Sequence, residues 1–385
     1  MRSSIYQAIS VMALMAGAIW NGYPIVYSDT SSYLGSGFEM ETLVDRPITY
    51  GIFILITSLH GATLWTTIAA QCLLLGIVLR SFLAQLHVRS DQVKLVIVAL
   101  ISMLTGLTFV TGQLMADVFT PIMLLSCFLA ITSPAINSIA MFAIYTVAFA
   151  MHMSHIPIML IVLFLITIYF FFTNKKTLRT RILPIILLSL IATIPMGVSI
   201  SKSSHVFFMA RMAENGILQE FLQENCADGH YRLCQAENIP QDANAFMWAP
   251  KGPLTLYANW ADAGSEFNQI ISGSLGSRKY LMLHAQALFR STAMQLGSFA
   301  IADGTGAFGQ GTLLHQRLSR YVPNELEQYE KSRQFQGKLN TEDLEILVMI
   351  HQIILLLSVA VLVIYLIIAK IRRDFFTGNI RAVIY

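Results

Sequence analysis

A series of long apolar segments is the feature that most constrains this sequence. A helix that spans a membrane needs about 20 mostly apolar residues. Stretches of this kind lie at residues 5–25, 65–86, 94–110, 115–132, 138–152, 156–173, 183–200 and 345–369. Only 12% of the 385 residues are charged, whereas soluble domains carry about 25%. We therefore expect an all-α polytopic membrane protein with about eight transmembrane helices.

The positions of lysine and arginine predict how the segments are oriented. Clusters of basic residues stand beside the apolar stretches at Arg80, Arg89 and Lys94, at Lys175, Lys176, Arg179 and Arg181, and at Lys370, Arg372 and Arg373. Such clusters stay on the cytoplasmic side of a membrane. With eight crossings and a cytoplasmic start, all three clusters are cytoplasmic. A further crossing at 48–58 would place them all outside, so this short stretch is expected to be an interfacial or re-entrant helix.

The same orientation predicts the domain organisation. Residues 1–200 would form a membrane domain whose first outer loop, 26–47, faces the same side as the turns at 111–117 and 152–155. Residues 201–344 would form a mainly helical extracytoplasmic domain before the last transmembrane helix, 345–370. The remainder, 371–385, would be a cytoplasmic tail, and it resembles the start of another apolar segment, as in a truncated product.

Within residues 201–344 we expect one amphipathic helix at 205–222 and a second at 277–299 that lies along a membrane surface. Cys226 and Cys234 stand close together in this polar region. Such a pair is typical of a disulfide in an oxidising compartment. Two free thiols remain the alternative, because spacing alone does not fix the connectivity of cysteines.

Two aspartates lie at the predicted outer ends of apolar segments. Asp29 follows the first segment in a Ser/Thr-rich stretch, where it could accept a proton or hold a metal. Asp117 opens a later segment and is flanked by apolar residues. A carboxylate at a membrane edge is costly unless water, a partner or a substrate compensates its charge, so it is first interpreted as a functional residue. Structural roles stay open, because aspartate also caps helices and favours their N-terminal ends.

These residues resemble the GT-C superfamily, membrane glycosyltransferases that use lipid-phosphate-linked sugars. The resemblance covers residues 5–170 and rests on Asp29-Thr-Ser-Ser-Tyr33, on Asp45-Arg-Pro-Ile-Thr-Tyr50 and on Asp117. It implies that Asp29 is the catalytic base or a metal ligand, that Asp117 is the second acidic residue, and that Tyr33 and Asp45 line the substrate site. The family often has an adjacent acidic pair where this chain has Asp29 and Thr30. This departure weakens the metal-dependent version, although a divalent metal stays an option; the sequence indicates no other cofactor.

A lipid-linked donor would need cations to hold its phosphate at the outer face. The candidates are Arg46, His60, His152, His155 and Arg211. Arg46 is preferred because the guanidinium fork matches phosphate oxygens, with a salt bridge to Asp45 or Glu41 as the alternative. His152 and His155 lie one turn apart and could ligate a metal, but without a third ligand ordinary polar histidines are the better interpretation.

The leading hypothesis is an inverting glycosyltransferase of the cell envelope. It would act in a bacterial inner membrane, with residues 26–47 and 201–344 in the periplasm, and move a sugar from a polyprenyl phosphate to a glycan, lipid or protein acceptor. The alternative is a transporter or lipid flippase with Asp117 as the coupling residue. Transporters place charges near the midplane on broken helices, often within inverted repeats. A net charge of +3 gives no indication of a nucleic-acid partner.

Overall fold

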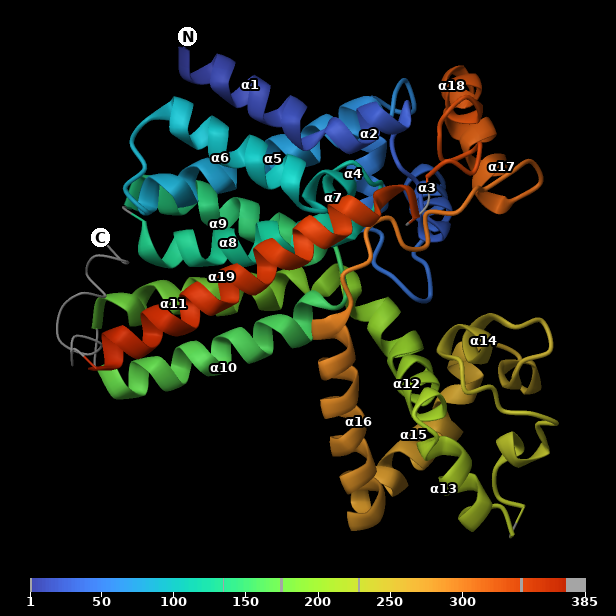
Figure 1. The fold of residues 1–385 in the computed structure, drawn as a ribbon. Helices are drawn as coiled ribbons and strands as arrows, with labels where there is room; N and C mark the ends of the chain where they lie inside the picture. Colours follow the sequence, from blue (N-terminus) through green and yellow to red (C-terminus); the bar gives the residue numbers. More distant parts are fainter. Residues whose placement is uncertain (1, 134, 174–175, 228, 340–341, 372–385) are drawn as a thin grey trace. The chain divides into compact units, whose positions relative to one another are not determined.

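The computed structural model describes residues 2–133, 135–173, 176–227, 229–339 and 342–371, and these residues fold into helices (Figure 1). No β-strand occurs in these ranges, apart from one isolated bridge between Ile25 and Gln113. The expectation of an all-α chain is confirmed. Lys175 of the second basic cluster, Arg372 and Arg373 of the third, and the tail from residue 372 lie outside the described residues.

The chain divides into two compact units. Unit 1 contains the residues up to Glu41, Pro47–Met196 and the residues from Phe299 onward, and unit 2 contains Thr42–Arg46 and Gly197–Ser298. The boundary therefore lies at Ser298, whereas the sequence grouped residues 299–344 with the preceding polar region. The reason is that buried polar side chains of this returning segment hydrogen-bond to residues near the N-terminus, as described below.

Long helices of unit 1 lie alongside one another (Figure 1). Their bounds are α1 Arg2–Leu14, α5 Trp65–Gln85, α6 Asp91–Leu104, α8 Phe119–Thr132, α9 Ala135–Ala150, α10 His155–Thr173, α11 Lys176–Ala192 and α19 Glu345–Ile371. Shorter helices are α2 Ala16–Asn21, α3 Ser28–Glu39, α4 Thr49–Thr57, α7 Leu107–Thr111, α17 Leu313–Tyr321 and α18 Leu326–Glu330. Helix α1 packs on α5 and α6, and α8 packs on α5, α9 and α11. The apolar side chains between them, including Leu14, Ile68 and Phe119, are fully buried.

Helix length agrees only in part with the predicted membrane spans. By length and composition, 2 helices of the described residues could cross a membrane, Trp65–Gln85 and Glu345–Ile368. Shorter apolar helices run over Ser4–Leu14, Ala116–Thr132, Ser138–Ala150, His155–Ile168 and Thr180–Ala192. The set of about eight full-length spans is thus not seen as continuous helices. One cause is that the apolar stretches 5–25 and 94–110 are each broken into two helices.

The two breaks pack against each other. Glycine permits this contact, since a Cβ on Gly17 would lie only 2.6 Å from the Thr108 carbonyl oxygen. The Gly17 N–H donates to Thr108 Oγ1 at 2.6 Å. The hydroxyls of Thr108 and Thr111 donate in turn to the Leu14 carbonyl, at 3.2 and 2.5 Å. Threonine hydroxyls therefore satisfy backbone groups at the point where α1 ends.

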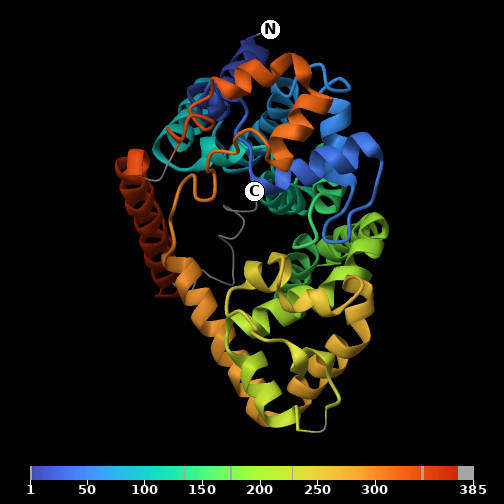
Figure 2. The same cartoon turned by 90° about the vertical axis from the view of Figure 1, so that its right-hand side faces the viewer.

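Unit 2 is a separate helical body with its own core (green to orange in Figure 2). Its helices are α12 Gly197–Glu214, α13 Ile217–Asn225, α14 Ala243–Trp248, α15 Trp260–Gly276 and α16 Arg278–Gly297. The predicted helix at 205–222 is divided between α12 and α13, because Gly216 adopts a left-handed backbone with φ of 73°. The predicted helix at 277–299 corresponds to α16. Cys226 and Cys234 form a disulfide that closes the loop after α13.

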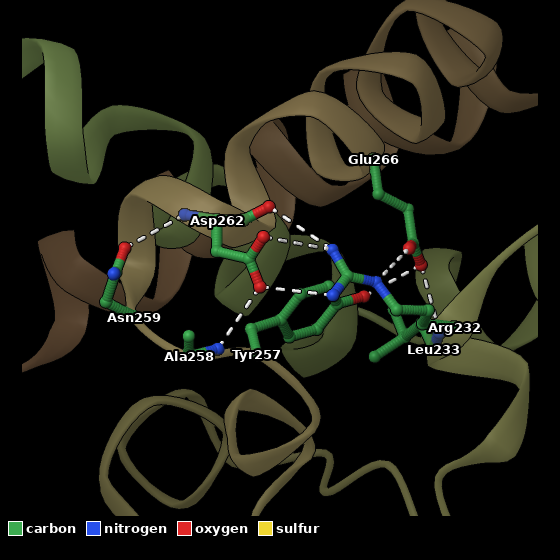
Figure 3. Close-up of polar contacts among 7 residues, drawn as sticks. All are labelled: Arg232, Leu233, Tyr257, Ala258, Asn259, Asp262 and Glu266. Carbon is green, nitrogen blue, oxygen red and sulfur yellow. Dashed lines mark hydrogen bonds and ion pairs between the residues drawn. The ribbon is translucent and has the colours of Figure 1, made fainter.

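A polar cluster attaches this disulfide loop to α15 (Figure 3). The Arg232 guanidinium donates to Asp262 Oδ2 at 3.1 Å, pairs with Glu266 at 3.5 Å, and stacks 4.4 Å from the Tyr257 ring centroid. Glu266 Oε1 accepts from the Tyr257 hydroxyl at 2.7 Å and from the Leu233 N–H at 2.9 Å. One carboxylate thereby joins a cation, a phenol and the backbone of the loop.

Replacing Phe267 by alanine tests the core of unit 2. The ring is fully buried and lies 5.3 Å from the Tyr257 ring and 6.2 Å from the Phe246 ring, centroid to centroid. We expect the free energy of unfolding of this unit to fall by about 4 kcal/mol, measured by denaturant titration with limited proteolysis. Leu275→Ala on the same helix is the control: its side chain is 43% exposed, so the loss should stay below about 1 kcal/mol. Equal losses in the two variants would contradict this account of the core.

Candidate functional site

Backbone pairing brings the start of α3 beside the segment that carries Asp117. The Ile25 N–H donates to the Gly112 carbonyl at 2.9 Å, and the Leu114 N–H donates to the Ile25 carbonyl at 2.8 Å. Thr30 Oγ1 adds a bond of 3.0 Å to the Leu114 carbonyl while it accepts from the Tyr27 N–H at 2.9 Å. Asp29, in the first turn of α3, is therefore held near the short helix η1, Ala116–Val118, which contains Asp117.

Three carboxylates act on the Tyr27 ring. Burial, followed by the negative charges of Asp29, Asp303 and Asp117, raises the pKa of the Tyr27 hydroxyl, because each carboxylate repels the phenolate. Gly304 lies directly against this ring, and a Cβ at Gly304 would overlap it. We call Tyr27, Asp29, Asp117 and Asp303 the acidic cluster. It joins residues from three distant parts of the chain, and Asp117 and Asp303 are exposed.

The buried amide of Gln334 holds the segment before Tyr27 and the segment after Asp303 in place relative to each other. Its Oε1 accepts from the Val26 N–H at 3.0 Å, and its Nε2 donates to the carbonyls of Val26 at 2.6 Å and Thr305 at 3.1 Å. The Gln334 N–H donates to Asn21 Oδ1 at 2.8 Å. Because these bonds lie immediately beside Tyr27 and Asp303, Gln334 positions both the first loop and the returning segment.

A second buried amide, that of Gln71 in α5, supports the Asp117 side. Its Nε2 donates to the carbonyls of Thr111 and Gln113, each at 2.8 Å, and its Oε1 accepts from the Tyr50 hydroxyl at 3.2 Å. The turn before Asp117 therefore has its carbonyls bound from inside the unit. The Asp117 side chain itself remains exposed to a ligand.

Two predicted substrate-binding residues are instead part of the packed interior. Tyr33 is 1% exposed and packs edge-on against Tyr50, with ring centroids 4.8 Å apart. His155 is fully buried; its Nδ1 lies 3.1 Å from the Phe149 carbonyl and its Nε2 lies 3.0 Å from Thr120 Oγ1. Since a carbonyl only accepts, Nδ1 donates, and in the neutral ring Nε2 accepts from Thr120. Both side chains lack the free surface that their predicted roles require.

His152 and His155 do not form the metal pair that their spacing allows. Their ring centroids are 5.8 Å apart, and the His152 Nδ1 accepts from the Ser154 N–H at 3.1 Å. Among the described residues, no three His, Cys, Asp or Glu side chains are grouped so that they could hold a metal ion together.

Three other predicted residues belong to unit 2, whereas the acidic cluster is in unit 1. Arg46 pairs with Asp45 at 2.5 Å, which is the salt bridge considered as its alternative role. Arg211 pairs with Glu214 at 2.5 Å, and its side chain is 68% exposed. His60 lies in unit 1 and is exposed in the turn after α4. Within unit 1, the charges of Asp29 and Asp117 both act on Tyr27, and that of Asp117 also acts on the buried His155.

The sequence prediction missed Asp303 and a pair of arginines on α17. Figure 2 shows α17 lying against α3, and the contact is made by Arg317 and Arg320, which pair with Glu39 at 2.9 and 3.3 Å. The spacing of three residues between the arginines on an amphipathic helix was the available signal. Glu39 is ten residues after Asp29 in α3, a rise of about 15 Å, so these arginines hold α17 in place rather than reach Asp29. No signal pointed to Asp303, which stands alone in a loop.

No protein-family model matches this chain, and neither the curated proteins nor the solved structures include a significant match to it. The acidic cluster is therefore the feature of this chain that indicates its function.

Replacing Gln334 by leucine should destabilise unit 1. The substitution keeps the volume but leaves the buried N–H and carbonyl of Val26 without their side-chain partners. We expect a loss of about 3 kcal/mol in the free energy of unfolding, followed by denaturant titration. Gln336→Leu is the control, since this side chain is exposed and its two bonds, to the Lys331 carbonyl and from the Lys338 ammonium, lie at the surface. A loss of the same size in both variants would contradict the assigned role.

Neutralising one carboxylate of the acidic cluster should lower the pKa of the Tyr27 hydroxyl. Asp29→Asn and Asp303→Asn each remove a charge that opposes formation of the phenolate. The pKa can be followed by NMR titration of tyrosine labelled at Cζ, with the Tyr27 signal identified in a Tyr27→Phe variant. Glu327→Gln, at an exposed pair with Lys331, should leave the Tyr27 pKa unchanged. An unchanged value in both aspartate variants would show that the carboxylates lie away from the ring.

Proposed function

We propose that the chain is an integral membrane glycosyltransferase that moves a sugar from a polyprenyl phosphate to an extracytoplasmic acceptor, with inversion at the anomeric carbon. The observation that carries this proposal is that the start of α3 is bonded to the segment before Asp117, so that the charges of Asp29 and Asp117 both act on Tyr27. These two acids are the ones that the resemblance to the GT-C superfamily singles out, and they come from chain segments far apart in sequence. The apolar helices of unit 1, two of them long enough to cross a membrane, support an embedded position for this unit.

In this reaction Asp29 acts as the general base. Its carboxylate is half-buried at the first turn of α3, where it can take the proton from the acceptor hydroxyl. The hydroxyl oxygen forms a bond to the anomeric carbon while the bond from that carbon to the phosphate oxygen breaks, and polyprenyl phosphate leaves with the electron pair. Attack from the side opposite the phosphate gives inversion. Asp117, which is exposed, would stabilise the positive charge that develops on the sugar.

A lipid donor also requires a site that opens at the membrane surface. Asp29 lies in the helix that follows apolar α2, and Asp117 lies just before apolar α8. An embedded unit 1 would therefore hold the acidic cluster at the level of the headgroups. Thr30 stands where an adjacent acidic pair would place its second carboxylate, and this supports a role of Asp29 as base over one as metal ligand. The observed environment of the cluster therefore suits the base-catalysed version.

Transport is a second candidate, because α1–α2 and α6–α7 are broken helices that meet at their breaks. Broken helices of this kind hold substrates and ions in transporters. In this chain the Leu14 carbonyl at the break already accepts from two threonine hydroxyls, so it does not need an ion. Asp117 would be the coupling residue of such a transporter, and Asp29 would then be dispensable.

The Asp29→Asn variant tests the transferase proposal. We expect transfer from polyprenyl-phosphate hexoses and pentoses in proteoliposomes to fall roughly 10²- to 10⁴-fold, the usual contribution of a general base. Glu327→Gln, an exposed acid of unit 1, should retain full activity.

An Asp29→Asn protein that is present at the normal level and transfers sugar at the wild-type rate would overturn the assignment of the base. If the same variant also keeps uptake or lipid movement that Asp117→Asn abolishes, the transport candidate replaces the transferase.

A further inference from the structure

Helix α16 of unit 2 carries an apolar stripe that no part of its own unit covers. The stripe consists of residues spaced three or four apart, so that they share one face of the helix: Leu281, Ala285, Leu288, Phe289, Thr292 and Leu296. Phe289 and Leu296 are 75% and 73% exposed. Contiguous exposed apolar surface of this kind marks an interaction site.

The opposite face of α16 already has its partner. Tyr280, Leu283 and Ala287 pack on the core of unit 2, and the Tyr280 hydroxyl donates to Glu224 at 2.5 Å. The helix therefore does not need its second apolar stripe to stay attached to unit 2. This stripe needs a separate explanation.

The charges of α16 indicate which partner fits the stripe. The helix has no acidic residue and carries Arg278, Lys279 and Arg290. Lys279 is engaged by Glu220 at 2.6 Å and by Glu224, whereas Arg278 and Arg290 are exposed. Arg278 precedes Leu281 by three residues and so lies on the stripe face, whereas Arg290 follows Ala287 by three residues and lies on the face turned to unit 2. An exposed arginine beside leucine and phenylalanine, with no acidic residue on the helix, is typical of helices that lie in the surface of a membrane with anionic lipids.

We propose that α16 is an interfacial helix that inserts its Leu281–Leu296 stripe into an anionic lipid surface. Phe289 and the leucines enter the boundary between headgroups and acyl chains, and Arg278, which shares their face of the helix, contacts the lipid phosphates. This inference rests on the membrane location in the proposed function, but not on the transfer chemistry. Unit 2 would thereby be anchored to the bilayer by a surface of its own.

Depth measurement by electron paramagnetic resonance tests the proposal on the full chain in nanodiscs of phosphatidylethanolamine and phosphatidylglycerol. A nitroxide is attached at Phe289→Cys in a background in which the buried free thiols are removed by Cys72→Ala and Cys127→Ala, with the disulfide kept. Reference labels are placed at Leu356→Cys in α19 and at Glu237→Cys in the polar loop of unit 2, both exposed. Accessibility to oxygen and to a water-soluble nickel complex is compared at each position.

We expect the oxygen-to-nickel accessibility ratio at position 289 to rise well above that at 237 and to approach that at 356. A label at Leu281→Cys, on the same stripe, should give the same high oxygen-to-nickel ratio. It provides the measurement if the Phe289→Cys variant fails to fold. Arg278→Gln should lower the ratio at 289 and leave that at 356 unchanged, whereas Arg290→Gln, on the other face of the helix, should leave both ratios unchanged.

Two readings at 289 would overturn the proposal. A ratio equal to that at 237 would mean that the stripe faces water, and exclusion of both reagents would mean that protein, such as a second copy, covers it. In either case a bilayer reading at 356 would leave the membrane location intact, whereas a water-like reading at 356 would overturn that location itself.

Discussion

Unit 1 depends on buried amide side chains that satisfy backbone groups where helices end. Gln334 binds the N–H and carbonyl of Val26, and Gln71 binds the carbonyls of Thr111 and Gln113. An unpaired buried N–H or carbonyl costs about 1–3 kcal/mol, so each glutamine secures an irregular segment that could not otherwise be buried. The helices supply apolar packing, but these amides decide which loops lie together. The acidic cluster is a result of that arrangement.

The sequence was sufficient for the helical class. Apolar segments of helical length predicted most of the helices of unit 1, whereas the shared site of Asp29 and Asp117 stays a prediction, which their common effect on Tyr27 supports. The breaks near Met15 and Gly106 were not predicted, because they depend on Gly17 and Gly112 packing against a distant backbone. Hydropathy averaged over a window depends only on residues that are neighbours in sequence, so it cannot indicate contacts with a distant backbone. For the same reason the return of residues 299–339 to unit 1 was not foreseen.

Residue roles were harder to predict than residue positions. Tyr33 and His155 are chemically suited to bind a substrate, yet burial and internal partners occupy them. Arg46 was chosen for its charge, and its neighbour Asp45 engages that charge. A polar side chain in a motif gives no indication of whether its partner is a ligand or another residue. Asp303, by contrast, stands before a glycine-rich stretch, Gly304-Thr-Gly306-Ala-Phe-Gly309, that is typical of a loop, and it gains its significance from its place beside Tyr27.

The insertion of unit 2 between the parts of unit 1 has a consequence for biosynthesis. Val26 and Gln334, which bond to each other, are separated by 308 positions in the chain. At a translation rate of about 5–20 residues per second, roughly 15–60 s pass between the synthesis of the two. During that interval the first loop emerges without the segment that completes it. Asp29 and Asp117 can be in place early, but Asp303 arrives last, so the nascent chain has an incomplete acidic cluster until the whole of unit 2 has been synthesised.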